Sequence, residues 1–361
     1  MNGLCVRWAA LGVFSFLIQV PAHADLIITP TFDPTLSNPT VQATINAAIQ
    51  TYEGLFTNPI DVQIYFQSGS PLGQNDYFAS VVTYQSFYDG LMATDANPAA
   101  FAALNANGGD ADTNGGRNPV TGNMFILAKS ANLRAVGINQ APDCQLGTPG
   151  AGGIPHDCSG NSGPAYDAII SLNTSITSPP LSLDGNYGLL STVEHEIDEV
   201  LGIGSSLVNC AQSNNPNAAC SSGNITFAND TQGTNAPMPE DLYRWNATGG
   251  RSPGTNCNAP TSAFFSYGPS TGQIAQFDNS CDGGDFGDWQ QSGTPLTQDA
   301  FATPGANPTL GAKEIAALTA IGYTINAEVP EPGTALFPLA LAVLAYWKRC
   351  SAKKAGSFFR V

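Results

Sequence analysis

The segment Glu194-His195-Glu196-Ile197-Asp198-Glu199-Val200-Leu201-Gly202 decides how this 361-residue chain is interpreted. It predicts an amphipathic helix over residues 189–202, because the apolar residues recur at helical spacing on one face. His195 and Glu199 lie one turn apart on the opposite face, with Glu196 offset to one side. The helix therefore presents an imidazole and two carboxylates away from its apolar face.

The charge of this segment points to a cation. Four carboxylates crowd residues 194–199, and the sequence has no Lys or Arg between Arg134 and Arg244. Like charges at this spacing destabilise a helix by tenths of a kcal/mol each. A bound divalent cation would turn that repulsion into ligation. The alternative is a solvated polar face that carries one incidental histidine.

The helix differs by one residue from the metal helix of a zinc protease. In the H-E-x-x-H pattern a second histidine follows four residues after the first, and the glutamate beside the first is the general base. Here Glu199 stands at the second position, so His195 and Glu199 are the predicted metal ligands and Glu196 the predicted catalytic base. Glutamate can bind zinc through oxygen. Zinc is the first expected cofactor, with Mn²⁺ or Ca²⁺ as alternatives because carboxylates suit harder cations.

No spacing marks a third ligand. A Met-turn protease has its third ligand ten residues after the first histidine, where this chain has Ser205. The candidates, in order of preference, are Asp241, Asp198, Glu240 and His156. A separate acidic turn at 110–115 matches the start of a calcium loop, but Thr121 stands where the loop needs a glutamate. That turn is therefore predicted to be a surface turn.

Both ends of the chain predict export. Residues 1–24 combine Arg7, an apolar run and a small-x-small cleavage site, which is typical of a secretory signal peptide. Residues 328–361 begin near Pro-Glu-Pro, continue into a short apolar segment predicted to be a transmembrane helix, and end in a basic tail. This is a stop-transfer arrangement. The alternatives are an uncleaved N-terminal helix and a simple C-terminal anchor. The domain between the predicted signal peptide and the predicted sorting tail spans residues 25–327.

The charge and cysteine content of that domain narrow its partners and its compartment. It has 27 acidic and 6 basic residues, a net charge of −21, which argues against nucleic acid and anionic membranes as partners. An even number of cysteines in an exported chain predicts disulfides, and the order in the chain suggests local pairs. The suggested pairs are Cys144 with Cys158, Cys210 with Cys220, and Cys257 with Cys281. The C-x-x-C spacing of many zinc sites does not occur among these cysteines, so they are not predicted to bind zinc.

The predicted fold class is α+β, with a loop-rich, disulfide-bonded C-terminal half. Apolar periodicity predicts helices and strands in the N-terminal half, and a helix that closes the domain. The predicted helices are 40–52, 80–92, 130–136, 189–202 and 312–321. The predicted strands are 60–66, 124–127 and 166–172.

Several short segments carry a family resemblance. They are Ser130-Ala131-Asn132-Leu133-Arg134-Ala135, SLNTS at 171–175, Pro239-Glu240-Asp241-Leu242-Tyr243-Arg244-Trp245, Gly284-Asp285-Phe286-Gly287-Asp288-Trp289 and Ala320-Ile321-Gly322-Tyr323. With the C-terminal signal they resemble a family of exported, PEP-CTERM-tagged, zincin-like metalloproteases, whose helix usually reads H-E-I-x-H-x-L-G. The resemblance spans most of residues 25–327 and departs from the pattern at Glu199.

The resemblance implies a zincin-like fold, with a mixed sheet and an active-site helix, and metal-dependent hydrolysis of peptides. It also implies delivery to the cell surface or the extracellular space of a Gram-negative bacterium. The tail would hold the protein briefly in the inner membrane until a sorting enzyme acts on it. Two functions follow from the sequence. One is an exported metal-dependent peptidase. The other is a non-catalytic cell-surface or exopolysaccharide-matrix protein that retains a degenerate protease fold.

Overall fold

A computed structural model describes residues 25–145, 164–179, 185–209, 224–227, 235–256 and 261–326. The predicted signal peptide and the predicted sorting tail lie outside these ranges, as does His156. In the part of the chain that is described, no helix is both long and apolar enough to cross a membrane. Two cysteines, Cys144 and Cys281, fall within the described ranges, and both are disulfide-bonded. The suggested pairing stays a prediction.

The centre of the molecule is a mixed four-stranded sheet in the order β1-β2-β8-β3. Strands β1 (Ile27–Phe32), β2 (Asp61–Ser68) and β8 (Ala168–Leu172) are parallel, and β3 (Gly73–Tyr77) runs antiparallel to β8 at the edge. Every residue of β8 is buried, as expected for an inner strand with both faces covered. The α+β class and the mixed sheet predicted from the sequence are confirmed.

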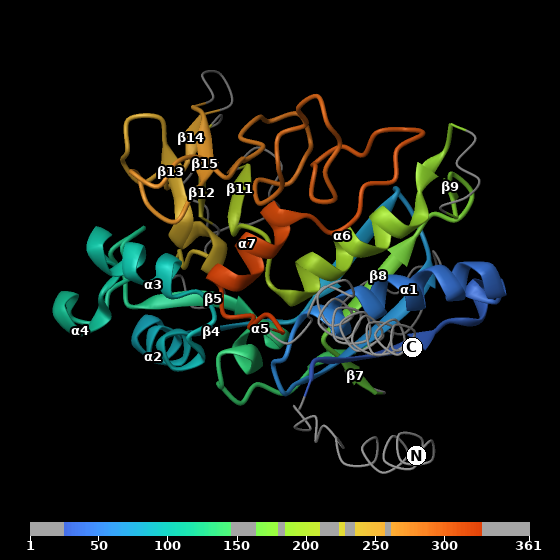
Figure 1. The fold of residues 1–361 in the computed structure, drawn as a ribbon, viewed down its shortest axis with the longest axis horizontal. Coiled ribbons are helices and arrows are strands. Elements are labelled where there is room, and N and C mark those ends of the chain that lie inside the picture. The colour runs from blue at the N-terminus through green and yellow to red at the C-terminus, as the bar shows by residue number, and fades with distance from the viewer. Residues whose placement is uncertain are drawn as a thin grey trace, which may run out of the picture.

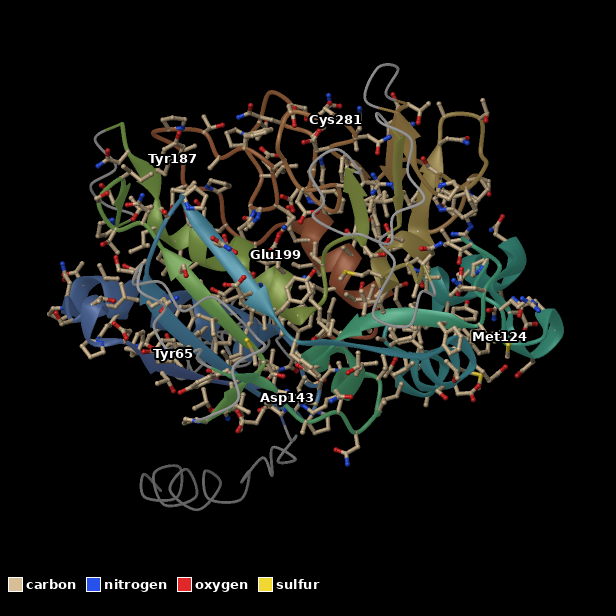
Figure 2. The ribbon with its side chains drawn as sticks, turned by 180° about the vertical axis from the view of Figure 1, so that it is seen from behind. Tyr65, Met124, Asp143, Tyr187, Glu199 and Cys281 are labelled. Atoms are coloured by element: carbon tan, nitrogen blue, oxygen red, sulfur yellow. The ribbon has the colours of Figure 1, made fainter. Side chains whose placement is uncertain are left out.

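Two helices cover one face of this sheet. Helix α1 (Pro39–Leu55) begins after Asn38, whose side chain accepts a hydrogen bond from the Thr40 amide. Helix α6 (Leu189–Leu201) contacts α1, β8 and β3. Both lie in front of the sheet in Figure 1 and behind it in Figure 2. The apolar residues of α6 are buried in the main core, so its other face is turned toward the loops of the C-terminal half.

The remaining elements flank this unit (Figure 1). Strand β4 (Ala79–Thr83) pairs with β5 (Phe125–Lys129). The prediction of a helix from residue 80 was wrong at its start, because residues 80–83 extend to pair with β5 and Thr83 caps the helix that follows. The flanking helices are α2 (Tyr84–Thr94), α3 (Pro98–Leu104), α4 (Ala111–Asn114), α5 (Ser130–Ala135) and α7 (Ala312–Ala320), with short turns η1 (Pro34–Leu36), η2 (Asn105–Gly109) and η3 (Pro239–Tyr243).

The rest of the described chain, most of it in the C-terminal half, is built of short strands and long connections. The short strands are β6 (Cys144–Gln145), β7 (Ala165–Tyr166), β9 (Thr177–Ser178), β10 (Tyr187–Gly188), β11 (Leu207–Asn209), β12 (Asn224–Phe227), β13 (Arg244–Asn246), β14 (Thr255–Asn256), β15 (Ala263–Phe265) and β16 (Ala275–Gln276). Residues 277–311 contain no helix or strand of this set. This stretch lies over α6 (Figure 1), and it supplies the partners of the polar face of that helix.

Candidate metal site

Three side chains converge where the polar face of α6 meets the loops. His195, Glu199 and Asp288 each offer one ligand atom, and these atoms all lie within 4.8 Å of one another. His195 Nε2 is 3.8 Å from Glu199 Oε1 and 3.7 Å from Asp288 Oδ2. The two ligands predicted on the helix are thus brought together, and the third member comes from a loop about 90 residues further along.

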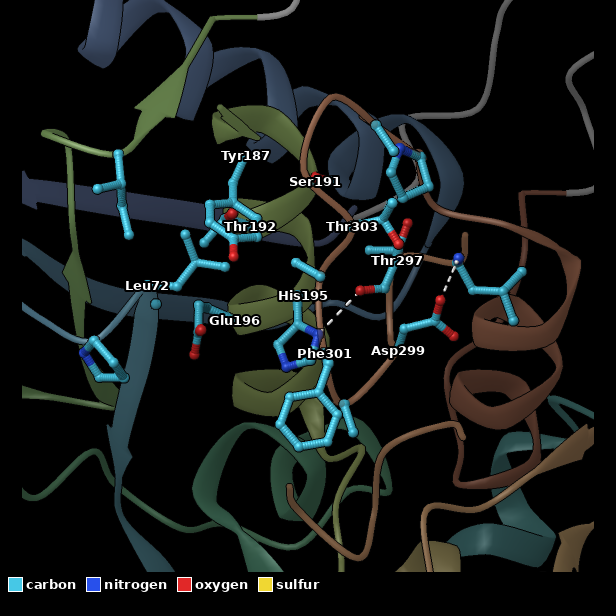
Figure 3. A pocket seen from close by; sticks show the side chains of 18 of the residues that line it. Leu72, Tyr187, Ser191, Thr192, His195, Glu196, Thr297, Asp299, Phe301 and Thr303 are labelled. Carbon is cyan, nitrogen blue, oxygen red and sulfur yellow. Dashed lines mark hydrogen bonds between the residues drawn. The ribbon is translucent and has the colours of Figure 1, made fainter. Parts of the chain in front are cut away.

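The orientation of His195 suits a metal ligand. Its Nδ1 lies 3.0 Å from the carbonyl oxygen of Thr297, the contact drawn as a dashed line in Figure 3. A carbonyl only accepts hydrogen bonds, so Nδ1 carries the proton and donates it. In the neutral ring the lone pair is then on Nε2, which faces the two carboxylates. Ligating histidines are commonly fixed in this way, with the second nitrogen donating to a carbonyl or carboxylate.

Asp288 is held by its own set of contacts. Gln298 Nε2 donates to Asp288 Oδ1 at 2.7 Å, which leaves Oδ2 on the side of His195. The preceding residue, Gly287, packs so closely that a Cβ there would lie 2.4 Å from the Cα of Gly204. Residues 287 and 288 are therefore pressed against the segment that leaves α6, and only glycine allows this approach.

The electrostatics of the site favour a positive partner. Burial raises the pKa values of Glu199 and Asp288, and repulsion from Asp285 adds to both shifts. Burial alone would lower the pKa of His195, but the carboxylates of Glu196 and Glu199 outweigh it and the pKa is raised. Binding of either a proton or a cation would therefore stabilise the group electrostatically. Protons and cations compete for the same nitrogen and oxygen atoms.

A buried lysine lies close to the acidic helix, for which the sequence predicts no nearby basic residue. Lys129, at the end of β5, is 2% exposed and donates from Nζ to the carbonyl of Ile203 at 2.7 Å. Its Nζ also lies 3.9 Å from the ring centre of Tyr77. Lys129 lowers the pKa of Glu199 through its charge. The acidic helix is therefore not uncompensated, because the fold supplies a cation that the local sequence does not show.

Glu196, the predicted base, lies beside the three ligands. Its carboxylate is buried and packs against β3, since a Cβ on Gly73 would lie 2.1 Å from Glu196 Oε1. Asn75 Nδ2 donates to the Glu196 carbonyl at 3.0 Å. Burial and the charge of Glu199 raise the pKa of Glu196 well above its usual range. A carboxyl with a raised pKa is suited to take up a proton near neutral pH.

His195 and Glu196 open onto one cavity of about 480 Å³. Figure 3 shows both residues with Tyr187 and Phe301 around this space. The walls come from the turn before β3, from α6 and from the loop after residue 295. The apolar lining includes Leu72, Ile176, Tyr187, Leu296, Phe301 and Pro308. A cavity of this size with a few convergent polar groups is typical of a small-molecule or side-chain binding site.

The other third-ligand candidates lie elsewhere. Asp241 accepts hydrogen bonds from Ser205 Oγ at 2.7 Å and from the Met238 amide at 2.9 Å, so it fixes the loop after α6. Asp198 accepts from Tyr52 on α1 at 2.9 Å, which directs it toward α1 and the core. Glu240 accepts from the Gly204 amide at 2.7 Å.

The candidate ligand group therefore contains Asp288 where the sequence predicts Asp241. Asp288 belongs to one of the segments on which the family resemblance rests, residues 284–289. That segment was the signal that could have pointed to it. The acidic turn at 110–115 is a cap, because Asp110 accepts from the Asp112 amide at the start of α4.

The fold and the site define an α+β protein with a candidate metal centre of one imidazole and two carboxylates. No protein-family model, curated protein or solved structure matches the chain. A functional assignment therefore rests on the geometry of the site.

Proposed function

We propose that the protein is a metal-dependent hydrolase that cleaves peptide bonds. The observation that carries this proposal is the convergence of His195, Glu199 and Asp288, together with the opening of His195 and the neighbouring Glu196 onto one cavity. In this reading the three residues hold a divalent cation and Glu196 is the general base. The arrangement agrees with the zincin-like fold that the sequence resemblance implies.

The donor set fits a divalent cation. One neutral imidazole and two carboxylates are ligands that zinc accepts in catalytic sites with three protein ligands. The two carboxylates also suit Mn²⁺ and Ca²⁺, so zinc is the first cofactor to test and these two follow. A cation in such a site supplies Lewis acidity and lowers the pKa of bound water.

Residues of the chain supply proton transfer and hold the candidate ligands in position. Glu196 accepts the proton of the attacking water and returns it to the leaving amine, a role that its buried position and raised pKa support. Thr297 keeps His195 in the tautomer that a ligand needs. Gln298 holds Asp288 in place through Oδ1.

A peptide is the substrate class that the surroundings favour. Strand β3 borders the site, and among the described strands it pairs on one side alone, with β8. Figure 2 shows Glu199 beside this edge of the sheet. An extended peptide can add to such an edge through main-chain hydrogen bonds. The apolar lining of the cavity then has room for a substrate side chain.

The test compares the wild-type protein with Glu196→Gln and His195→Ala. Metal content is measured by mass spectrometry, and hydrolysis is measured on an unfolded protein substrate and a peptide library. We expect one equivalent of metal in the wild type and in Glu196→Gln, and none in His195→Ala. We expect Glu196→Gln to lose at least about 100-fold in hydrolysis rate. Unchanged hydrolysis in Glu196→Gln would exclude the assigned base.

A second candidate function is a non-catalytic surface or matrix protein. Lys129 favours it, because a buried cation beside Glu199 can balance part of the acidic group without a metal. This candidate predicts no metal in the wild type and no hydrolysis that depends on metal. In both cases we propose export by residues 1–24, sorting by residues 328–361, and the exopolysaccharide matrix as a partner.

A further inference from the structure

We propose that Gln298 is a fourth ligand of the candidate metal site, and that its side-chain oxygen shifts the preference of the site from zinc toward Mn²⁺. The proposal rests on the metal site of the proposed function and adds one residue to it. It is built on the position of the Gln298 amide beside His195 and Asp288, and on a buried oxygen of that amide.

The side-chain amide of Gln298 lies against two of the three candidate ligands. Its Nε2 donates to Asp288 Oδ1 at 2.7 Å and lies 3.5 Å from His195 Nε2. His195 Nε2 carries the lone pair of the ring, because Nδ1 donates its proton to the Thr297 carbonyl. The hydrogen-bearing end of the amide, which is its positive end, therefore lies beside both an imidazole lone pair and a carboxylate.

The oxygen end of the same amide lacks a partner. Gln298 is 0% exposed, and its Oε1 accepts no hydrogen bond from any residue in the described part of the chain. Buried polar atoms nearly always have a hydrogen-bond partner, so each exception calls for an explanation such as a bound ion or water. The present orientation of the amide thus satisfies its nitrogen and leaves its oxygen without a donor.

Rotation of the amide exchanges its two ends. The last side-chain torsion of glutamine is broad and two-fold, so a turn of about 180° returns the group to an allowed position. After this turn Oε1 takes the place of Nε2, next to His195 Nε2 and Asp288. Two oxygens repel one another there unless a cation lies between them. A cation therefore selects the rotated amide, and its bond to Asp288 replaces the hydrogen bond that the rotation removes.

The distances around His195 Nε2 agree with a shared cation. This atom lies 3.8 Å from Glu199 Oε1, 3.7 Å from Asp288 Oδ2 and 3.5 Å from the Gln298 amide nitrogen. Ligand atoms about 2.1 Å from a metal, at tetrahedral or octahedral angles, are about 3.0–3.4 Å apart. All three atoms are therefore within about 1 Å of such an arrangement. The distance to Gln298 is long for a hydrogen bond, which usually measures about 2.7–3.2 Å.

The added oxygen changes which cation the site prefers. The ligand set becomes one imidazole nitrogen and three oxygens. Zinc is bound by cysteine, histidine and carboxylate side chains, whereas carbonyl oxygens together with carboxylates suit Mg²⁺, Ca²⁺ and Mn²⁺. Among these three cations the imidazole favours Mn²⁺, the transition metal. An octahedral cation with four protein ligands also keeps about two positions for water and substrate, as the proposed hydrolysis requires.

The experiment measures the Kd for Mn²⁺ and for Zn²⁺, by competition with a chelator, in the wild type, Gln298→Met and Gln298→Glu. Methionine conserves the size of the side chain and removes both polar atoms. Glutamate keeps an oxygen and removes the N–H donor. Gln291→Glu is the matched control, because Gln291 is exposed in the same stretch of chain and the substitution adds the same charge. Thermal denaturation shows whether each variant is folded.

The two Gln298 variants should behave differently. We expect Gln298→Met to bind Mn²⁺ at least about 10-fold more weakly than the wild type, and to lose less of its affinity for zinc. We expect Gln298→Glu to bind Mn²⁺ at least as tightly as the wild type, because a carboxylate oxygen then takes the place of the amide oxygen. Gln291→Glu should bind both metals as the wild type does.

Weaker binding of Mn²⁺ by Gln298→Glu than by the wild type would overturn the proposal, because Gln298 would then act only as an N–H donor to Asp288. Equal losses of Mn²⁺ and zinc affinity in Gln298→Met would overturn the preference for Mn²⁺. If Gln298→Met does not fold, the comparison of Gln298→Glu with the wild type still decides whether the oxygen is a ligand. A wild type that binds neither metal would refute the proposed metal site as a whole, whereas weak binding by Gln298→Glu alone leaves that site standing.

Discussion

Replacing Gly287 with alanine should displace Asp288 from the candidate metal site while leaving all three candidate ligands in the sequence. The new Cβ would lie 2.4 Å from the Cα of Gly204 and 2.6 Å from the Ser205 amide nitrogen. Both are backbone atoms, so no side-chain rotation relieves the overlap. The backbone of Gly287 does not have a positive φ, and the effect of alanine is therefore steric.

The size of the displacement follows from these distances. Ordinary carbon contacts begin near 3.5 Å, so the loop must withdraw by about 1 Å. Metal–ligand distances tolerate about 0.2 Å, which is much less. We therefore expect metal affinity to fall about 100-fold, at the upper end of the effect of disturbing a ligand's support. Overpacking of this kind also lowers the free energy of unfolding by about 1–3 kcal/mol.

The assay is zinc affinity by competition with a chelator, alongside thermal denaturation of the same samples. Gly54→Ala is the matched control, because a Cβ at position 54 of α1 meets no atom within 4 Å. In that exposed part of a helix, alanine should raise stability by about 0.5–1 kcal/mol and leave zinc affinity unchanged. If Gly287→Ala kept the zinc affinity of the wild type, Asp288 would not be a ligand positioned by this contact.

Two further predictions separate the acidic residues around the site. Asp288→Asn should lose metal, whereas Asp241→Asn should retain it. Asp241→Asn should instead lower the free energy of unfolding by about 1–3 kcal/mol, because buried donors lose an acceptor. Metal content and urea denaturation of both variants test these two predictions. Burial raises the pKa of Glu240 well above its usual range, so the native state keeps a proton that the unfolded chain releases above about pH 4.3. Stability from this group is then present below that pH and is lost as pH rises through the folded pKa, by up to about 1.4 kcal/mol per pH unit. Glu240→Gln cannot ionise and should remove this slope, which urea denaturation at about pH 5 and about pH 8 would measure; an unchanged slope would contradict the assignment.

The elements predicted best were those whose signal is local. The period of apolar residues in 189–202 places α6 within a residue of its observed end, and alternation in 60–66 finds β2. Strand β4 was missed because its extended form depends on pairing with β5, about 45 residues away. The residues of β4 alone do not distinguish a strand from the first turn of the helix that Thr83 caps.

The sequence predicted the residues of the site that lie on one helix, but not the residue that comes from a loop. His195, Glu196 and Glu199 are fixed relative to one another by helical spacing, so the sequence was enough to place them together. Asp288 is placed by packing between glycines and by Gln298, and neither leaves a spacing rule in the sequence. Asp241 was the preferred third ligand, but its oxygens accept hydrogen bonds from Ser205 and Met238.

The acidic helix is resolved by the fold into groups with different partners. Glu194 accepts from the Leu310 amide and Asp198 from Tyr52, so both point away from the cavity and are met by neutral donors. Burial raises the pKa of each of these carboxyls and outweighs the donors, which favour the ionised form, so each carboxyl is best kept protonated. The crowding seen in the sequence is thus relieved for half of the residues without any cation.

The remaining charge has the magnitude that a divalent cation neutralises. Glu196, Glu199 and Asp288 contribute three negative charges when ionised, Lys129 contributes one positive charge, and His195 is neutral in the tautomer set by Thr297. The group then carries −2. In the absence of metal the same balance requires two protons, which agrees with the raised pKa values of His195 and of the three carboxyls. Substituting glutamate for the second histidine of a zinc helix adds one negative charge, and the buried Lys129 offsets that charge. A site with Glu199 can therefore hold a divalent cation with the same overall neutrality as a site with two histidines and two carboxylates.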